Sequence, residues 1–176
     1  MNVLKIILIV IVAIIGLVLV VALFVKNDYT IERQLAINKP AAEVFDYIRY
    51  VKNQDHYNKW TMMDPNMKKD FKGSDGAVGF VYAWDGNDKA GKGEQEITRI
   101  DPGKELDLEI RFIKPFEGTA QTKMITKPAS ENQTVVSWSM AGHSKYPMNI
   151  TNLFTDAMLG KDLEASLLNL KNIMEK

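Results

Sequence analysis

LGKDLEASLLNLKNIMEK, residues 159–176, decides the fold, because it is the longest charged, proline-free helical pattern outside the N-terminal segment. Its apolar residues recur at spacings of three and four, which places them on one face of a helix; they are Leu159, Leu163, Leu167, Leu170 and Met174. About 16 residues at ~1.5 Å per residue give a rod of about 24 Å, long enough to cross a small sheet. We therefore expect a sheet that curves around this helix.

The segment just before this helix, residues 143–159, has an apolar stripe of its own. The stripe consists of Ile150, Leu153, Phe154 and Ala157 at helical spacing. If one helix continued at about 3.6 residues per turn, the stripe would next reach the charged Lys161 and Glu164. The pattern predicts a break or bend at Leu159–Lys161, to which the flexible Gly160 would contribute. Residues 143–159 would then be a separate short helix or a flap over a cavity mouth.

Upstream of this region the sequence alternates in the manner of β-strands. Residues 105–112 alternate most cleanly, with Leu106, Leu108, Ile110 and Phe112 on one side and charged residues on the other. Similar patterns, separated by turn sequences, occur at residues 29–37, 79–84, 93–100, 119–126 and 134–140. Residues 41–51 have the spacing of an amphipathic helix that begins after Asn38-Lys39-Pro40. Short strands joined by turns predict an antiparallel meander and an α+β fold.

The N-terminal segment contains an uncharged apolar run, residues 6–25, with Lys5 before it and Lys26 after it. At ~1.5 Å per residue the run spans about 30 Å, the thickness of the hydrocarbon core of a bilayer. The alternative is a cleaved signal peptide, but the run exceeds the roughly 7–15 apolar residues of a signal core and lacks a small-residue cleavage site. We expect residues 1–28 to be a single-pass transmembrane anchor with its flanks, and residues 29–176 to be a domain held at the membrane. The flanking charges do not decide on which side it lies.

The composition argues against several classes of function. The 176 residues include 22 lysines plus arginines and 22 aspartates plus glutamates, so no basic surface favours a nucleic acid partner. The absence of cysteine excludes disulfides, thiolate metal sites and a cysteine nucleophile. His56 has no histidine or carboxylate at metal-ligand spacing on a helix face, so we expect it to face solvent, and we expect no metal or cofactor. Four carboxylates alternate with apolar residues and should face water on the outside of the sheet: Glu94, Glu96, Asp107 and Glu109.

The order of elements resembles the SRPBCC superfamily, the START/Bet v 1-like helix-grip fold that includes polyketide cyclase/dehydrase-like and Hsp90-ATPase-activator-like proteins. The matching residues are Ile37–Phe45 at the strand-to-helix entry, Trp60 with Asp64-Pro65, Gly93-x-x-x-Ile97-Thr98-x-Ile100, and Leu167-x-x-Leu170-Lys171. The resemblance covers residues 29–176, and the N-terminal anchor is an addition that compact members lack. It implies a deep apolar cavity between sheet and C-terminal helix, which the family uses for lipids, sterols, polyketides or hormones. The family has no universal catalytic set, so the resemblance carries over a fold and a cavity and not an activity.

We predict ligand-binding residues in this cavity or at its mouth, and no catalytic residues. They are Trp60, Tyr82, Gln95, Phe112, Trp138, His143, Tyr146, Phe154, Met158, Leu163 and Leu167. A few polar groups among apolar ones would orient a ligand. For His143 and Tyr146 the alternative is a solvent-facing histidine and a simple Tyr-Pro turn.

Three functions remain open from the sequence, in the following order. The first is a membrane-anchored module that holds a hydrophobic small molecule or lipid. The second is a protein-interaction or chaperone-associated domain close to the membrane, which would show an exposed apolar patch. The third is a cyclase/dehydrase-like or hydrolase-like enzyme that uses His143 or a tyrosine, which would need a buried group with a perturbed pKa in the cavity.

Overall fold

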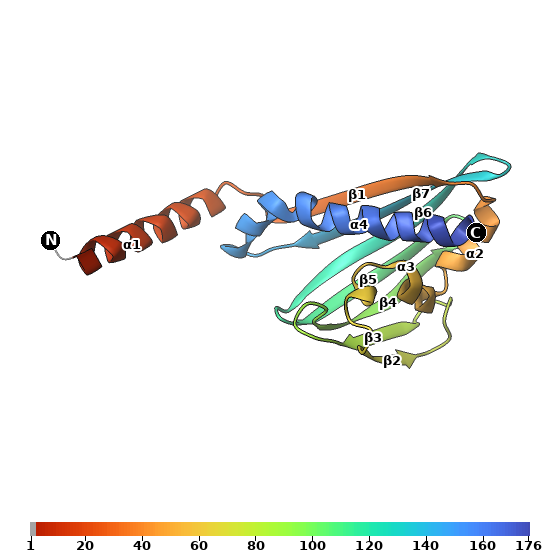
Figure 1. The fold of residues 1–176 in the computed structure, drawn as a ribbon, viewed down its shortest axis with the longest axis horizontal. Coiled ribbons are helices and arrows are strands. Elements are labelled where there is room, and N and C mark those ends of the chain that lie inside the picture. Colours follow the sequence, from red (N-terminus) through yellow and green to blue (C-terminus); the bar gives the residue numbers. More distant parts are fainter. Residues whose placement is uncertain (1–2) are drawn as a thin grey trace.

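The computed structural model describes residues 3–176, which fold into an apolar N-terminal helix followed by an α+β unit (Figure 1). The helices are α1 (Val3–Ala22), α2 (Ala41–Ile48), α3 (Gln54–Tyr57) and α4 (Asn152–Met174), with short 3-10 turns η1 (Val51–Asn53), η2 (Thr61–Met63) and η3 (Met148–Thr151). The strands are β1 (Asp28–Ile37), β2 (Lys68–Lys72), β3 (Val81–Asp85), β4 (Lys92–Asp101), β5 (Glu105–Lys114), β6 (Gly118–Ser130) and β7 (Gln133–His143).

The strands form a single antiparallel sheet in the order β1-β7-β6-β5-β4-β3-β2. The first strand pairs with the last along its whole length, from Asp28↔His143 to Ile37↔Thr134. The sheet curves, and α4 runs along its concave side while α2 and α3 cover one end (Figure 1). This is the predicted helix-grip architecture, and the fold class is confirmed.

The core lies where the second half of α4 packs on the sheet. Leu163, Leu167 and Leu170 are fully buried there, as the spacing of residues 159–176 predicts. The inward side chains of the strands alternate with exposed ones, so each strand contributes every second residue to this layer. Burial of such side chains stabilises the fold by roughly 1.5–3 kcal/mol each.

The predicted break near Leu159–Lys161 is wrong, because α4 passes through Gly160 as one continuous helix. Gly160 is buried, and a Cβ at this position would collide with the guanidinium of Arg33 on β1. Arg33 lies across the helix there, with Nη1 2.9 Å from Asp156 Oδ1 and Nε 2.6 Å from Glu164 Oε1. The glycine thus allows a strand residue to approach the helix closely. The segment expected to form a flap is η3 and the first turns of α4, and its apolar side chains at Leu153 and Phe154 are exposed.

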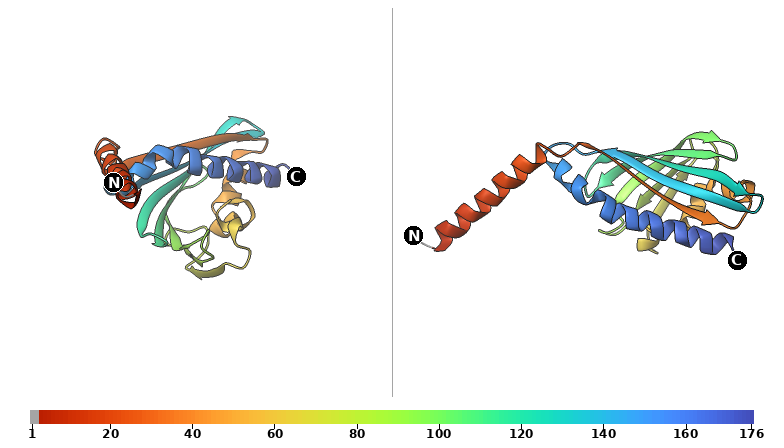
Figure 2. Two further views of the ribbon diagram at one scale, coloured as in Figure 1. Left: turned by 60° about the vertical axis from the view of Figure 1, so that its left-hand side comes forward. Right: turned by 90° about the horizontal axis from the view of Figure 1, so that it is seen from above.

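Helix α1 extends away from the sheet at the end where α4 begins (Figure 2). It is the one described helix that is long and apolar enough to cross a membrane, and the apolar part of it is exposed. Its last residues contact the segment before α4: Asn149 Nδ2 donates to the carbonyls of Ala22 at 2.7 Å and Val25 at 2.8 Å. Asn149 is buried, so these bonds cap the C-terminal end of α1.

Candidate functional site

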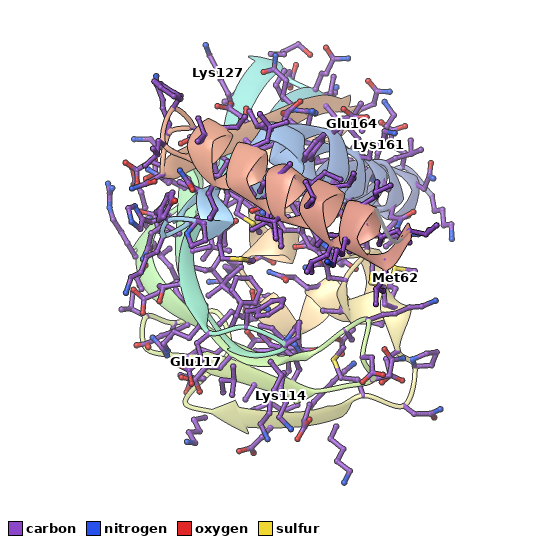
Figure 3. The ribbon with its side chains drawn as sticks, turned by 90° about the vertical axis from the view of Figure 1, so that its left-hand side faces the viewer. Met62, Lys114, Glu117, Lys127, Lys161 and Glu164 are labelled. Atoms are coloured by element: carbon purple, nitrogen blue, oxygen red, sulfur yellow. The ribbon has the colours of Figure 1, made fainter. Side chains whose placement is uncertain are left out.

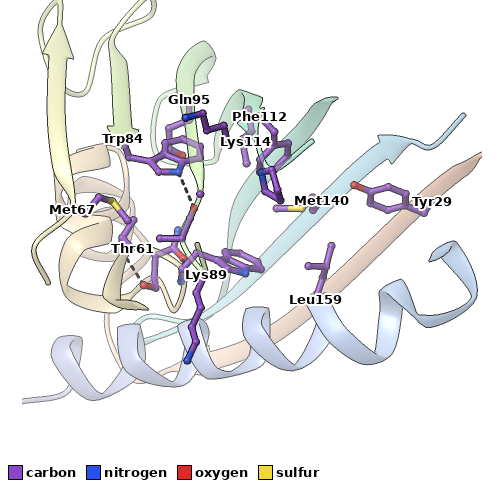
Figure 4. A pocket seen from close by; sticks show the side chains of 16 residues that line it. Tyr29, Thr61, Met67, Trp84, Lys89, Gln95, Phe112, Lys114, Met140 and Leu159 are labelled. Carbon is purple, nitrogen blue, oxygen red and sulfur yellow. Dashed lines mark hydrogen bonds between the residues drawn. The ribbon is translucent and has the colours of Figure 1, made fainter. Parts of the chain in front are cut away.

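A cavity of about 240 Å³ lies between α4 and the concave face of the sheet (Figure 4). The β1, β5 and β7 strands contribute Tyr29, Ile110, Phe112, Lys114 and Met140, and α4 contributes Leu159. The remaining walls are Asn58, Trp60, Thr61 and Met67 on one side, and Trp84, Lys89, Ala90, Gly91, Gln95 and Pro115 on the other. For comparison, an engineered apolar cavity of about 150 Å³ binds benzene, so this space accepts a larger apolar body.

One wall of the cavity is polar and internally hydrogen-bonded. Gln54 Oε1 accepts two bonds, from Asn58 Nδ2 at 2.8 Å and from Gln95 Nε2 at 3.1 Å. All three side chains are buried. The Gln95 amide donates one N–H to this bond, so its oxygen and its second N–H have no partner within the wall and could bind a ligand in the cavity.

Aromatic rings form the other walls, and one glycine makes room for them. Trp84 and Phe112 meet edge to face with ring centroids 6.4 Å apart, and Trp84 Nε1 donates to the Ala90 carbonyl at 3.1 Å (Figure 4). Gly93 lies under the Trp84 ring, where any Cβ would collide with it. The Trp84–Ala90 bond fixes the β3–β4 loop that closes this side of the cavity.

The mouth of the cavity is marked by lining residues that remain exposed, namely Lys89, Phe112, Lys114 and Pro115. Two ammonium groups therefore flank an otherwise apolar opening. Tyr29 lines the cavity as well, and burial raises the pKa of its phenol above the ordinary value. The phenol remains protonated at neutral pH and can donate a hydrogen bond.

Three residues predicted from the sequence line this cavity: Trp60, Gln95 and Phe112. Others on inward faces are packed into the solid core beyond it. Leu163 and Leu167 contact the sheet directly, and Trp138 is buried with Nε1 donating to Thr122 Oγ1 at 2.8 Å. Tyr82 is also buried away from the cavity, and its hydroxyl donates to Asp55 Oδ1 at 2.6 Å.

The remaining predicted residues lie on the surface. Phe154 and Met158 are exposed on α4, and Tyr146 is exposed beside α1. His143 is exposed at the end of β7, where its Nδ1 lies 2.7 Å from Asp28 Oδ1. His56 is exposed as predicted, and neither histidine lines the cavity. The acid–base role considered for His143 therefore has no cavity in which to act.

Several lining residues were not predicted, and the reason differs between them. Ile110 and Met140 follow from strand alternation, since they share faces with Phe112 and Trp138. Lys89, Ala90 and Gly91 lie in a loop whose sequence has no periodicity. The predicted outer carboxylates do face outward, and Arg111 bridges Glu94, Glu96 and Glu109 at 2.7 Å each.

Comparison with known proteins places the chain among proteins of this architecture. A family model described as polyketide cyclase / dehydrase and lipid transport matches residues 29–175. No curated protein sequence matches the chain.

Three solved structures illustrate the similarity. Norcoclaurine synthase from Thalictrum flavum, in complex with dopamine and hydroxybenzaldehyde, superposes with a TM-score of 0.65 at 12% identity, covering 83% of this chain and 86% of that one. A protein from Chromobacterium violaceum gives a TM-score of 0.60 at 14% identity, covering 84% and 97%. Ara h 8.0201 gives 0.53 at 16% identity, covering 81% and 98%. At these identities the similarity shows the fold alone.

Proposed function

Since the chain belongs to the polyketide cyclase/dehydrase and lipid transport family, we propose that it is a membrane-anchored module that holds a hydrophobic small molecule or lipid in the cavity between α4 and the sheet. The observation that carries the proposal is the cavity itself: about 240 Å³ of space with a mostly apolar lining and one hydrogen-bonded polar wall. Such a combination is typical of sites that bury an apolar ligand and orient it with a few polar groups.

The chemistry of the walls narrows the ligand class. Gln95 offers a hydrogen-bond acceptor inside the cavity, while Lys89 and Lys114 place positive charge at its mouth. A ligand with an apolar body, a hydroxyl or amide at its buried end, and an acidic group at its exposed end matches this arrangement. The described lining contains no histidine and no carboxylate, and burial raises the pKa of its one tyrosine, Tyr29, so that less of this phenol is ionised to act as a base; this favours binding over acid–base catalysis in this proposal.

The anchor is the second half of the proposal. We take residues 1–28 as a single-pass transmembrane segment with its flanks, and residues 29–176 as the ligand-binding domain. Support comes from α1, a 20-residue helix without a buried apolar face. A helix of this length spans about 30 Å, and exposing such a surface to water would be costly.

The test is native mass spectrometry of the full chain, released from detergent after purification from its own host. We expect an adduct of small-molecule mass. We also expect the adduct to disappear in Met140→Trp, where the larger side chain fills the cavity, and to persist in Ser139→Trp, which lies on the other face of β7. A native chain that stays free of adduct, even after incubation with a lipid extract of that host, would contradict the proposal.

A further inference from the structure

Large apolar side chains are exposed at the end of the molecule from which α1 leaves. On η3, α4 and the loop before them, exposure is 48% for Tyr146, 51% for Met148, 57% for Leu153, 61% for Phe154 and 67% for Met158. Such a concentration of exposed large apolar side chains within residues 146–158 is typical of an interaction surface, whereas isolated exposed apolar residues are common on proteins.

Contacts between this segment and α1 show which part of α1 lies beside the exposed apolar residues. Tyr146 Oη lies 3.5 Å from the carbonyl oxygen of Leu19, and Asn149 binds the carbonyl oxygens of Ala22 and Val25. Leu19 lies about 4.5 Å inside the end of α1, given ~1.5 Å per residue. If α1 crosses a bilayer, Tyr146 therefore lies near the edge of the hydrocarbon core, at the membrane–water interface where tyrosine is enriched in membrane proteins.

The register of the sheet brings a further apolar residue to the same end. Tyr29, just after α1, pairs with Gly142, and Gly142 pairs with Ala120 at the start of β6. The β5–β6 turn before it carries Phe116, which is 73% exposed. Viewed from the α1 side, Lys114 and Glu117 of this turn and Lys161 and Glu164 of α4 lie on opposite sides of α1 (Figure 3). In this view the turn lies on one side of α1 and the middle of α4 on the other, while Asn149 and Asn152 hold the start of α4 at the end of α1.

Beyond Gly160 the exposed side of α4 is mainly charged rather than apolar. It carries Lys161 and Glu164, and Leu168 is its exposed large apolar residue. Three of the four exposed large apolar residues of α4, namely Leu153, Phe154 and Met158, thus lie in the half next to α1, as expected if lipid rather than water meets that half. Lys26 and Lys145 lie at the same end and are exposed, so their ammonium groups can reach lipid phosphates.

From these observations we infer that the chain rests on the bilayer that α1 crosses, through a membrane-facing patch made of Phe116, Tyr146, Met148, Leu153, Phe154 and Met158. The occupant is the lipid headgroup and upper acyl region of that bilayer. The inference rests on the proposed anchor, but not on the identity or presence of a cavity ligand.

The test uses the full chain in nanodiscs of phosphatidylcholine and phosphatidylglycerol, one copy per disc. The native chain has no cysteine, so single substitutions can each carry an environment-sensitive nitrobenzoxadiazole label. Phe154→Cys and Met158→Cys probe the patch. Leu168→Cys is the matched control, because it is 51% exposed on the same helix beyond Gly160. Val12→Cys reports independently whether α1 lies in lipid.

We expect labels at positions 154 and 158 to be quenched several-fold more by nitroxide-bearing lipids than by aqueous iodide, and the label at position 168 to show the reverse. Aqueous quenching at 154 and 158 with lipid quenching at 12 would overturn the patch and leave the anchor intact. Aqueous quenching at 12 would instead remove the anchor on which the patch rests. A shielded label at 154 that neither quencher reaches would show that protein covers the surface, and it would also overturn the inference.

Discussion

At the scale of single residues, the contact between Arg33 and Gly160 explains a feature that the sequence alone makes ambiguous. A glycine in the middle of a helical pattern suggests flexibility, and it costs roughly 1 kcal/mol relative to alanine. Here the missing side chain leaves space for a guanidinium that pairs with Asp156 and Glu164, one turn to either side. These partners raise the pKa of Arg33 and lower that of Asp156. The glycine therefore joins α4 to β1 and does not interrupt the helix.

This contact predicts strong coupling between positions 33 and 160. Gly160→Ala should stabilise the Arg33→Ala variant by about 1 kcal/mol through helix propensity. In the native background the new methyl group displaces the guanidinium from its carboxylates, so the same substitution should gain less or lose stability. Chemical unfolding of the full chain in detergent, in a double-mutant cycle, measures the difference. An equal gain in both backgrounds would show that Arg33 and Gly160 are independent.

At the scale of elements, the sequence predicts which side of each strand is buried better than it predicts where α4 leaves a cavity above the sheet. Residues 105–112 alternate, and β5 buries Leu106, Leu108 and Ile110 as expected. The cavity lies between the sheet and α4, as the resemblance implies, but the sequence does not give most of the residues that line it. Three of them, Lys89–Gly91, lie in an aperiodic loop, and the periodicity of α4 does not show where the helix packs on the sheet and where it leaves space. Strand β2 was missed for a related reason: Lys68–Lys72 is exposed throughout and carries no alternation.

The two apolar stripes of residues 150–170 show a related limit of sequence patterns. One stripe, containing Leu163 and Leu167, is buried against the sheet, whereas the other, containing Leu153 and Phe154, is exposed. Their different directions suggested two helices, on the assumption that every apolar stripe must be buried inside the protein. One straight helix satisfies both stripes if the second has a different apolar neighbour, such as lipid.

Because Gly160 is the one buried residue in the first half of α4, the attachment of this half to β1 should depend on Arg33. We expect Arg33→Ala to accelerate amide hydrogen exchange at residues 153–160 and to leave residues 163–172 unchanged, since the latter are held by the core. Exchange followed by mass spectrometry on the full chain in detergent resolves the two halves. Lys39→Ala is a suitable control, because Lys39 pairs with Glu43 on α2, which lies beside the C-terminal end of α4 and not beside residues 153–160 (Figure 1). Uniform acceleration along α4 would mean that the helix opens as one unit.

At the scale of the whole molecule, α1, the proposed membrane-facing patch and the cavity mouth lie at one end. Two residues of the patch are direct sequence neighbours of residues that line the cavity: Met158 is next to Leu159, and Phe116 is next to Pro115. The proposed ligand site therefore opens beside the proposed lipid contact. For this placement to matter, α1 must hold a defined direction relative to α4. The residue positioned to fix that direction is Asn149, which is 2% exposed and caps α1.

We therefore expect Asn149→Ala to release α1 from its fixed orientation. The substitution removes the side-chain donor that binds the carbonyls of Ala22 and Val25, while Asn152 still holds the following residues through Lys26 and Asn27. The segment between α1 and the residues held by Asn152 would then act as a hinge.

Spin labels introduced by Val10→Cys and Leu168→Cys, with the chain in nanodiscs, report the angle between α1 and α4 as a distance distribution. The distribution should be narrow in the otherwise native chain and broad with Asn149→Ala. It should stay narrow with Asn132→Ala, which alters an exposed asparagine at the β6–β7 turn. A distribution unaffected by Asn149→Ala would mean that the bilayer contact, and not this cap, orients the domain.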